Sequence, residues 1–241
     1  MNDIAKRPSL IHRGPPDGSK IINPLGLCRQ SELNNSYNWG VIDILRWKVW
    51  PECLGGDRKA LRKYKDTWVA AHSETIKKEA ARFRISIILL AGVCWIEVGG
   101  DPDWIDSVAY ANRKFDHSGD PLLEPITITK KPELTSFGDV SIQLRRAAEA
   151  ADLDIKKLNS NQKDELIKCL SDEDINIAFV AKHLYQLKKI DKICFTEYYE
   201  IKIIGTRYNR GPSLSLKKIE ANTSYGDFIL KFKSHLETLL Q

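Results

Sequence analysis

The feature that most constrains the fold is a nearly continuous apolar run from Ile85 to Asp101, which carries one carboxylate, Glu97, just before a glycine pair. The run is too long for an ordinary strand and too short to span a bilayer. It therefore predicts a buried helix that ends where Gly99, Gly100 and Pro102 prevent it from continuing.

Glu97 lies in the last turn of this predicted helix, where a negative charge is disfavoured twice. The C-terminus is the negative end of the helix dipole, and apolar surroundings penalise ionisation. Both effects raise the pKa, and a carboxyl that is protonated near neutral pH suits general acid catalysis on a glycosidic oxygen. An isolated Glu at a frayed helix end more often extends into solvent, so the interpretation depends on the other segments.

The composition is that of an ordinary globular protein, with 241 residues, 42% hydrophobic and 29% charged. This length allows one sizeable core, or one domain with an N-terminal extension. Lys and Arg number 37 against 32 Asp and Glu, and the excess is spread along the chain. A positive charge suits an anionic polymer such as nucleic acid or cell wall but does not choose between them, and most of these charges are expected on a solvated surface.

The cysteines predict neither a disulfide framework nor a zinc site, because they are odd in number, widely spaced and without a Cys-x-x-Cys pair. We expect free thiols. The histidines show no metal-ligand spacing, so no metal and no cofactor are predicted. The N-terminus lacks an apolar segment, which predicts synthesis in the cytoplasm without a signal peptide or membrane insertion. The five cysteines are Cys28, Cys53, Cys94, Cys169 and Cys194.

The chain is expected to divide near residue 56. Residues 1–56 comprise a Pro- and Gly-rich arm and an aromatic stretch from Tyr37 to Trp50, which is expected to pack on the main domain, with a tryptophan platform for sugars as the alternative. Residues 57–241 form that main domain, which is predicted to be mainly α (α+β).

The main domain is predicted to be a series of helices with one short β excursion after the helix of Glu97. Ser136–Asp139 fits a capping box, so a helix is expected from Val140, with Ser141 and Gln143 near its N-terminus. A strand pair is possible at 125–129. Further helices are predicted within 57–84, at 161–170, after 171–174, at 195–206, and after 224–227 with Phe228, Phe232, Leu236 and Leu239 facing inward.

Four segments line up in the order seen in lysozyme-like peptidoglycan-cleaving enzymes, namely the soluble lytic transglycosylases and goose-type lysozymes. The helix ending in Glu97 resembles the helix of the family's catalytic glutamate, and Ser136–Gln143 resembles its Gly-Leu-Met-Gln segment. Asn176–Leu184 is similar to its Asn-Ile-x-x-Gly-x-x-Tyr-Leu helix, and Tyr208–Pro212 matches Tyr-Asn-x-Gly-Pro. The resemblance covers about residues 73–215.

The resemblance implies a lysozyme-like fold and cleavage of the β-1,4 bond between N-acetylmuramic acid and N-acetylglucosamine. Glu97 would be the general acid, Tyr208 would orient it, and Ser141, Gln143 and Asn209 would contact the glycan strand. The sequence departs from the family at three positions. Val98 stands in place of Ser, Val140 in place of Gly, and His183 in place of Tyr.

A hydrolase needs a second carboxylate, and Asp106, nine residues after Glu97, is the first candidate. Asp116, Asp120 and Asp139 are others, although a helix cap or an exposed loop acid is the simpler interpretation. Without a second acid, Glu97 would act as base toward the 6-hydroxyl of the sugar, which gives a lytic transglycosylase and a 1,6-anhydro product.

The chain is also similar to muramidase-type effectors delivered by bacterial type VI secretion. This likeness implies an antibacterial toxin that acts in the periplasm of a target cell, with an immunity protein and a component of the secretion machine as partners.

Two other classes remain open. A non-catalytic peptidoglycan- or protein-binding module could keep the fold without chemistry. A nucleic-acid-binding protein is ranked last, because the sequence has no recognition-helix or single-strand-binding signature.

Overall fold

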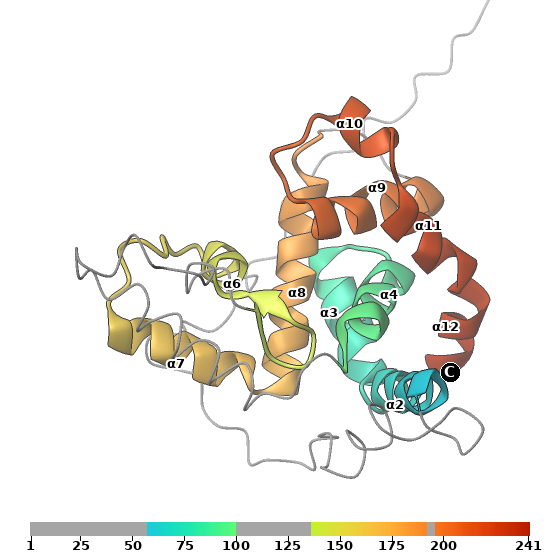
Figure 1. Ribbon diagram of the computed structural model, residues 1–241, viewed down its shortest axis with the longest axis horizontal. Coiled ribbons are helices and arrows are strands. Elements are labelled where there is room, and N and C mark those ends of the chain that lie inside the picture. The colour runs from blue at the N-terminus through green and yellow to red at the C-terminus, as the bar shows by residue number, and fades with distance from the viewer. Residues whose placement is uncertain (1–56, 100–135, 192–195) are drawn as a thin grey trace, which may run out of the picture.

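The part of the chain that the structure describes is mainly α-helical, with one small two-stranded sheet (Figure 1). The computed structural model describes residues 57–99, 136–191 and 196–241. Its elements are α2 (Asp57–Ala71), α3 (Ser73–Phe83), α4 (Ile87–Glu97), β1 (Ser136–Phe137), β2 (Ile142–Gln143), α6 (Leu144–Ala150), α7 (Ser160–Leu170), α8 (Glu173–Lys188), α9 (Glu197–Arg210), α10 (Leu216–Glu220), α11 (Ser224–Lys231) and α12 (Lys233–Leu239).

The helices form two lobes on either side of α8 (Figure 1). The large lobe contains α2, α3, α4 and α9 to α12, and the small lobe contains β1, β2, α6 and α7. Helix α8 contacts α3, α4 and α9 on one side and α6 and α7 on the other. It is therefore the element that joins the two lobes.

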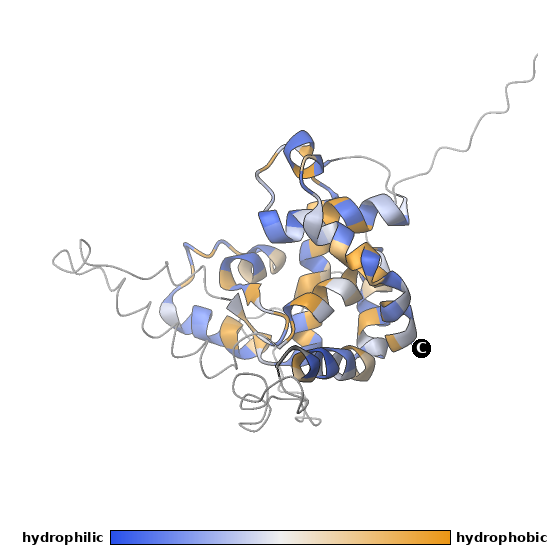
Figure 2. Ribbon diagram, turned by 45° about the vertical axis from the view of Figure 1, so that its right-hand side comes forward, coloured by the Kyte–Doolittle hydropathy of each residue, from blue (hydrophilic) through white to orange (hydrophobic). Residues whose placement is uncertain are grey.

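Helix α4 is the buried helix that the apolar run predicted. Ser86 caps its N-terminus by accepting a hydrogen bond from the backbone N–H of Leu89, and the helix ends at Glu97. Every residue from Ile88 to Trp95 is buried. Hydrophobic residues accordingly gather where the central helices meet, whereas α2 is largely hydrophilic (Figure 2).

Helix α8 also follows its sequence pattern. Asp172 caps its N-terminus by accepting a hydrogen bond from the backbone N–H of Ile175. Its apolar face is buried throughout; its members are Ile177, Val180, Ala181, Leu184 and Leu187.

The predicted capping box at Ser136–Asp139 is wrong, because these residues open a β-hairpin. Ser136 pairs with Gln143 and Phe137 with Ile142, and helix α6 begins only at Leu144. The buried Asn176 of α8 determines this geometry: its Oδ1 accepts a hydrogen bond from Val140 N, and its Nδ2 donates to Phe137 O. A tertiary contact with α8 thus outweighs the local helix signal. The strand pair considered at 125–129 lies outside the described residues.

The C-terminal segment differs from the single helix that the sequence predicted. It forms α11 and α12, which are separated at Phe232, where φ is −101° and ψ is 11°. Phe228 is 42% exposed rather than inward-facing, whereas Leu236 is buried. The break turns α12 against α4, so Leu236 reaches the core while Phe228 does not.

The cysteines are not all free thiols as expected. Cys94 is a buried free thiol, but Cys169 forms a disulfide whose partner lies outside the described residues. Spacing along the chain cannot show which thiols the fold brings together, which is why the sequence missed this bond.

None of the described helices combines the length and apolar character that crossing a bilayer requires. Residues 1–56 lie outside the described part.

Candidate functional site

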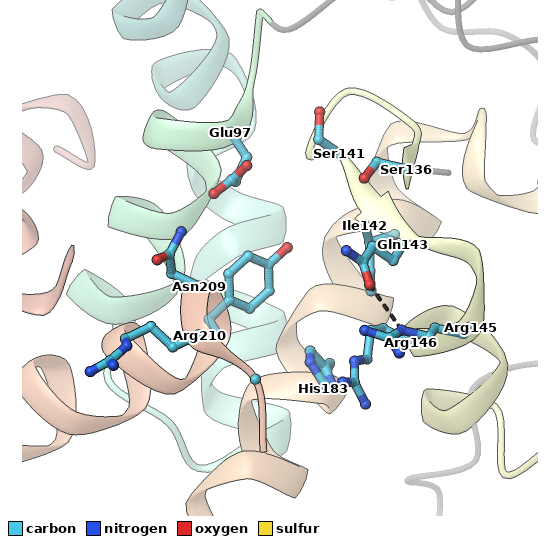
Figure 3. Close-up of a pocket in the computed structure, with 12 residues that line it drawn as sticks. Glu97, Ser136, Ser141, Ile142, Gln143, Arg145, Arg146, His183, Asn209 and Arg210 are labelled. Carbon is cyan, nitrogen blue, oxygen red and sulfur yellow. Dashed lines mark hydrogen bonds between the residues drawn. The ribbon is translucent and has the colours of Figure 1, made fainter. Parts of the chain in front are cut away.

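A pocket of about 240 Å³ lies between the two lobes. Figure 3 shows Glu97, Asn209 and Arg210 on one side and Ser136, Ser141, Gln143, Arg145 and Arg146 on the other. We call the large-lobe side the acid wall; it comprises Glu97, Tyr208, Asn209, Arg210 and Gly211. The opposite side is the arginine wall; it comprises Ser136, Ser141, Ile142, Gln143, Arg145, Arg146 and His183 of α8.

Five of the residues singled out in the sequence line this one pocket, although they come from three separate segments of the chain. They are Glu97, Ser141, Gln143, Tyr208 and Asn209. The proposed second acid, Asp106, lies outside the described residues, as do Asp116 and Asp120. Asp139 does not line the pocket; its Oδ2 accepts a hydrogen bond from Trp68 Nε1 at 3.0 Å.

The end of α4 places Glu97 at the pocket. Val98 is extended (φ −62°, ψ 142°) and Gly99 has a φ of 80°, so the chain leaves the helix directly after Glu97. The last carbonyls of a helix have no partner within it. Lys65 of α2 supplies one, because its Nζ donates to the carbonyl oxygens of Trp95 and Ile96. This contact fixes the helix end and places a positive group near the carboxyl.

The carboxyl of Glu97 has a raised pKa. Burial raises the pKa above its ordinary value, and a hydrogen bond from Tyr225 and the charge of Lys65 oppose the effect in part. Burial also lowers the pKa of Lys65 to about 8, against the influence of Glu97. Burial therefore shifts Glu97 toward its protonated form, and the groups beside it can stabilise the carboxylate once the proton has left.

The hydroxyl that contacts Glu97 belongs to Tyr225, not to Tyr208 as the resemblance implied. Tyr225 Oη donates to Glu97 Oε1 at 2.7 Å. Burial keeps the pKa of Tyr225 well above its usual range, so the phenol retains its proton. Gly226 allows α11 to pack closely on α9, which brings Tyr225 to Glu97. A Cβ at position 226 would lie 2.2 Å from the carbonyl oxygen of Lys202. A larger residue would separate α11 from α9.

Tyr208 joins the acid wall to α8 through its ring. The centroid of the ring lies 6.4 Å from that of Tyr225 and 5.8 Å from that of His183. Burial, and then the charge of Glu97, raise the pKa of Tyr208 well above its usual range. Its hydroxyl makes no hydrogen bond with the described residues, which leaves it able to donate to a molecule in the pocket.

The turn after Tyr208 and Asn209 is held by a buried ion pair. The guanidinium of Arg207 donates from Nε and Nη2 to the two carboxylate oxygens of Asp191, at 2.8 and 2.6 Å. Its Nη1 donates to the carbonyl oxygens of Pro212 and Leu214. Arg207 therefore anchors the segment that carries the acid wall.

The hairpin of the arginine wall is shaped by tight backbone geometry. Gly138 has a φ of 73°, and a Cβ there would lie 2.3 Å from Asn176 Nδ2, so only glycine fits. Ser141 has a φ of 33°, which is uncommon for a residue with a side chain. The strained residue lines the pocket, as strained positions at functional sites often do.

The arginine wall carries positive charge. Arg145 Nε donates to Gln143 Oε1 at 3.0 Å, and Arg146 Nη1 pairs with Glu149 at 2.6 Å. Burial, and then the charge of Arg146, lower the pKa of His183 to about 4, so the imidazole is neutral at neutral pH. Both arginines and Tyr225 were absent from the site predicted from the sequence. Two consecutive arginines after Gln143 were the available signal, and Tyr225 had none.

The described pocket can supply a proton and many hydrogen bonds to a polar ligand. Glu97 is its only carboxylate among the described lining residues. Within the same residues, no three His, Cys, Asp or Glu side chains gather as metal ligands. Comparisons of the chain with protein-family models, with curated proteins and with solved structures give no match.

Proposed function

We propose that the protein is a peptidoglycan-cleaving glycosidase, a muramidase or a lytic transglycosylase, in which Glu97 is the general acid. The observation that carries the proposal is the environment of Glu97. Its partly buried carboxyl has a raised pKa, accepts a hydrogen bond from Tyr225 and lines an interlobe pocket opposite polar side chains. A carboxyl that burial shifts toward its protonated form, and that faces a polar cleft, suits the protonation of a glycosidic oxygen.

In this mechanism the two oxygens of Glu97 have different roles. Tyr225 occupies Oε1, so Oε2 carries the proton to the oxygen of the β-1,4 bond as positive charge develops on the sugar ring. The carboxyl becomes a carboxylate in the same step. The hydroxyl of Tyr225 and the charge of Lys65 favour the carboxylate, so they stabilise Glu97 most as the bond breaks.

The second step defines two products. A hydrolase would use a water molecule and a second carboxylate, for which Asp106 remains the candidate. A lytic transglycosylase would use Glu97 itself as base toward the 6-hydroxyl of the sugar. Both routes begin with the same proton transfer from Glu97.

The proposal includes a lysozyme-like fold and a setting in the periplasm of a target cell, with an immunity protein that covers the pocket. The disulfide at Cys169 supports this setting, because disulfides persist in oxidising compartments such as the periplasm.

The test is digestion of purified peptidoglycan by the wild type and by Glu97→Gln, with the released fragments identified by mass spectrometry. Glu197→Gln is the matched control, since Glu197 lies on the surface of α9 and pairs with Lys233. We expect Glu97→Gln to reduce release by about a hundredfold or more and Glu197→Gln to leave it unchanged. Reducing ends would indicate a muramidase, and 1,6-anhydro ends a transglycosylase. Equal release by wild type and Glu97→Gln, or none by either folded protein, would refute the proposal.

A further inference from the structure

The arginine wall has an electrostatic imbalance that proton transfer from Glu97 does not use. Arg145 and Arg146 are consecutive at the start of α6, and among the described residues the carboxylate of Glu149 forms an ion pair with Arg146 but not with Arg145. Burial, and then the charge of Arg146, lower the pKa of Arg145, while the charge of Glu149 opposes the shift, so repulsion from Arg146 is the second cause after burial. An anion placed between them would relieve that repulsion.

The guanidinium groups retain donors for such an anion. Arg145 uses only Nε, toward Gln143, and both of its Nη atoms are unpaired among the described residues. Arg146 uses Nη1 toward Glu149, and its Nη2 lies across from Gly211, where even an added Cβ would be 3.8 Å away. Paired N–H groups of a guanidinium match the two oxygens of a carboxylate.

His183 is an independent observation that indicates a ligand. The side chain is 5% exposed, yet its Nδ1 has no hydrogen-bond partner among the described residues. A buried polar atom without a partner costs about 1–3 kcal/mol. Figure 3 places His183 next to the side chain of Arg146, at the pocket. His183 lines the pocket, so a ligand bound there would lie beside this imidazole.

We propose that Arg145, Arg146 and His183 form a subsite for a carboxylate of the glycan strand, so that the enzyme selects an acidic glycan over a neutral one. This inference rests on the proposed function. Peptidoglycan carries carboxylates on the lactyl ether of each muramic acid when the peptide has been removed, and on the stem peptide when it is present. The shared chemistry is a carboxylate held opposite the proton donor, at a fixed distance from the bond that is cleaved.

The subsite is tested by equilibrium binding in a Glu97→Gln background, which keeps the saccharides intact. The probes are a neutral chitin oligosaccharide, a peptide-free muramic acid oligosaccharide, its methyl ester, and the same oligosaccharide with its stem peptides. The double variant Arg145→Gln/Arg146→Gln tests the contribution of the arginine wall to binding. Arg210→Gln is the matched control, because Arg210 lines the same pocket but directs its guanidinium to the carbonyl oxygens of Lys218 and Asn222.

The free acid is expected to bind about tenfold more tightly than its methyl ester. The double arginine variant should lose that preference while binding chitin as before, and Arg210→Gln should keep it. A preference for the peptide-bearing form over the peptide-free acid would assign the carboxylate to the stem peptide, and the reverse to the lactyl group.

Equal affinity for acid and ester overturns the subsite, and this comparison needs no substitution beyond Glu97→Gln. An equal loss in Arg210→Gln also overturns it, since the effect would then be one of diffuse charge. If acid, ester and chitin all fail to bind, the proposed function itself fails. If chitin binds and the acid gains nothing, only the subsite fails.

Discussion

On both walls of the pocket, burial shifts the pKa of one titratable group toward its neutral form. The two walls differ in charge, because the arginine wall carries two consecutive arginines. Burial raises the pKa of Glu97 on the acid wall and lowers the pKa of His183 on the arginine wall. Both groups are therefore favoured in their neutral forms. The positive charge of the arginine wall comes instead from Arg145 and Arg146, which do not lose their protons.

The difference indicates how one pocket can separate two tasks. A neutral acid can give up a proton, whereas a pair of guanidinium groups can only hold an anion. Placing the two on opposite lobes keeps the arginines from stabilising the carboxylate form of Glu97 before the proton is needed. Lys65 and Tyr225 are the groups that stabilise it: Tyr225 donates to Glu97 itself, and Lys65 donates to the carbonyl oxygens of the two residues before it.

The largest effect, on stability, is expected from removing the buried ion pair between Arg207 and Asp191 that anchors the acid wall. Arg207→Met leaves the carboxylate of Asp191 buried without its partner and should lower the free energy of unfolding by about 3–5 kcal/mol. Urea denaturation measures the loss. The exposed neighbour Arg210 is the control, and Arg210→Met should cost less than about 1 kcal/mol. Equal losses would show that the ion pair does not hold this wall.

The arginine wall should show its own dependence of stability on pH. The pKa of His183 is about 4 in the folded protein and 6.5 in the unfolded chain. Between these values the unfolded chain binds the extra proton, so stability falls as the pH drops from 6.5 toward 4. His183→Gln should remove about 2 kcal/mol of the loss between about pH 7 and about pH 5, as measured by urea denaturation. An identical loss in both proteins would mean that His183 is not buried in its neutral form.

The hydrogen bond to Glu97 should have a smaller effect, on catalysis. Tyr225→Phe removes a group that lowers the pKa of Glu97, so the alkaline limb of the pH–rate profile should move to higher pH. The value of kcat/KM should fall about tenfold, since the carboxylate formed in the reaction loses a donor. Tyr208→Phe is the matched control and should leave the alkaline limb in place. A shift with Tyr208→Phe alone would give the positioning role to Tyr208.

The smallest effect is expected at Lys65. Lys65→Met removes a positive charge that lowers the pKa of Glu97, so the alkaline limb should again move upward, with a severalfold loss of kcat/KM. Lys65→Arg should restore most of the activity if charge matters more than geometry. A profile unchanged in Lys65→Met would limit Lys65 to capping α4.

The sequence predicted the acid wall better than the arginine wall, for a physical reason. Helix α4 and its end are encoded locally, by a long apolar run followed by glycines, so Glu97 could be located from neighbouring residues. The turn at Gly138 depends on Asn176 of another helix, and its local pattern indicated a helix cap instead.

The partners within the site could not be predicted in the same way. Tyr225 lies 128 residues from Glu97, and only the close crossing of α9 and α11 at Gly226 brings them together. Arg145 and Arg146 look like any solvated pair of charges in the sequence. The disulfide at Cys169 likewise depends on distances that the fold sets.

The central claim is that burial raises the pKa of Glu97 above its ordinary value, and this pKa can be measured directly. A titration of the side-chain carboxyl followed by carbon NMR, with Glu97→Gln to assign the signal, gives the value without any substrate. We predict a midpoint above the ordinary value of 4.5 and a further rise in Tyr225→Phe. A midpoint at or below 4.5 would mean that Glu97 is a carboxylate at neutral pH, and it would contradict the assignment of Glu97 as the proton donor.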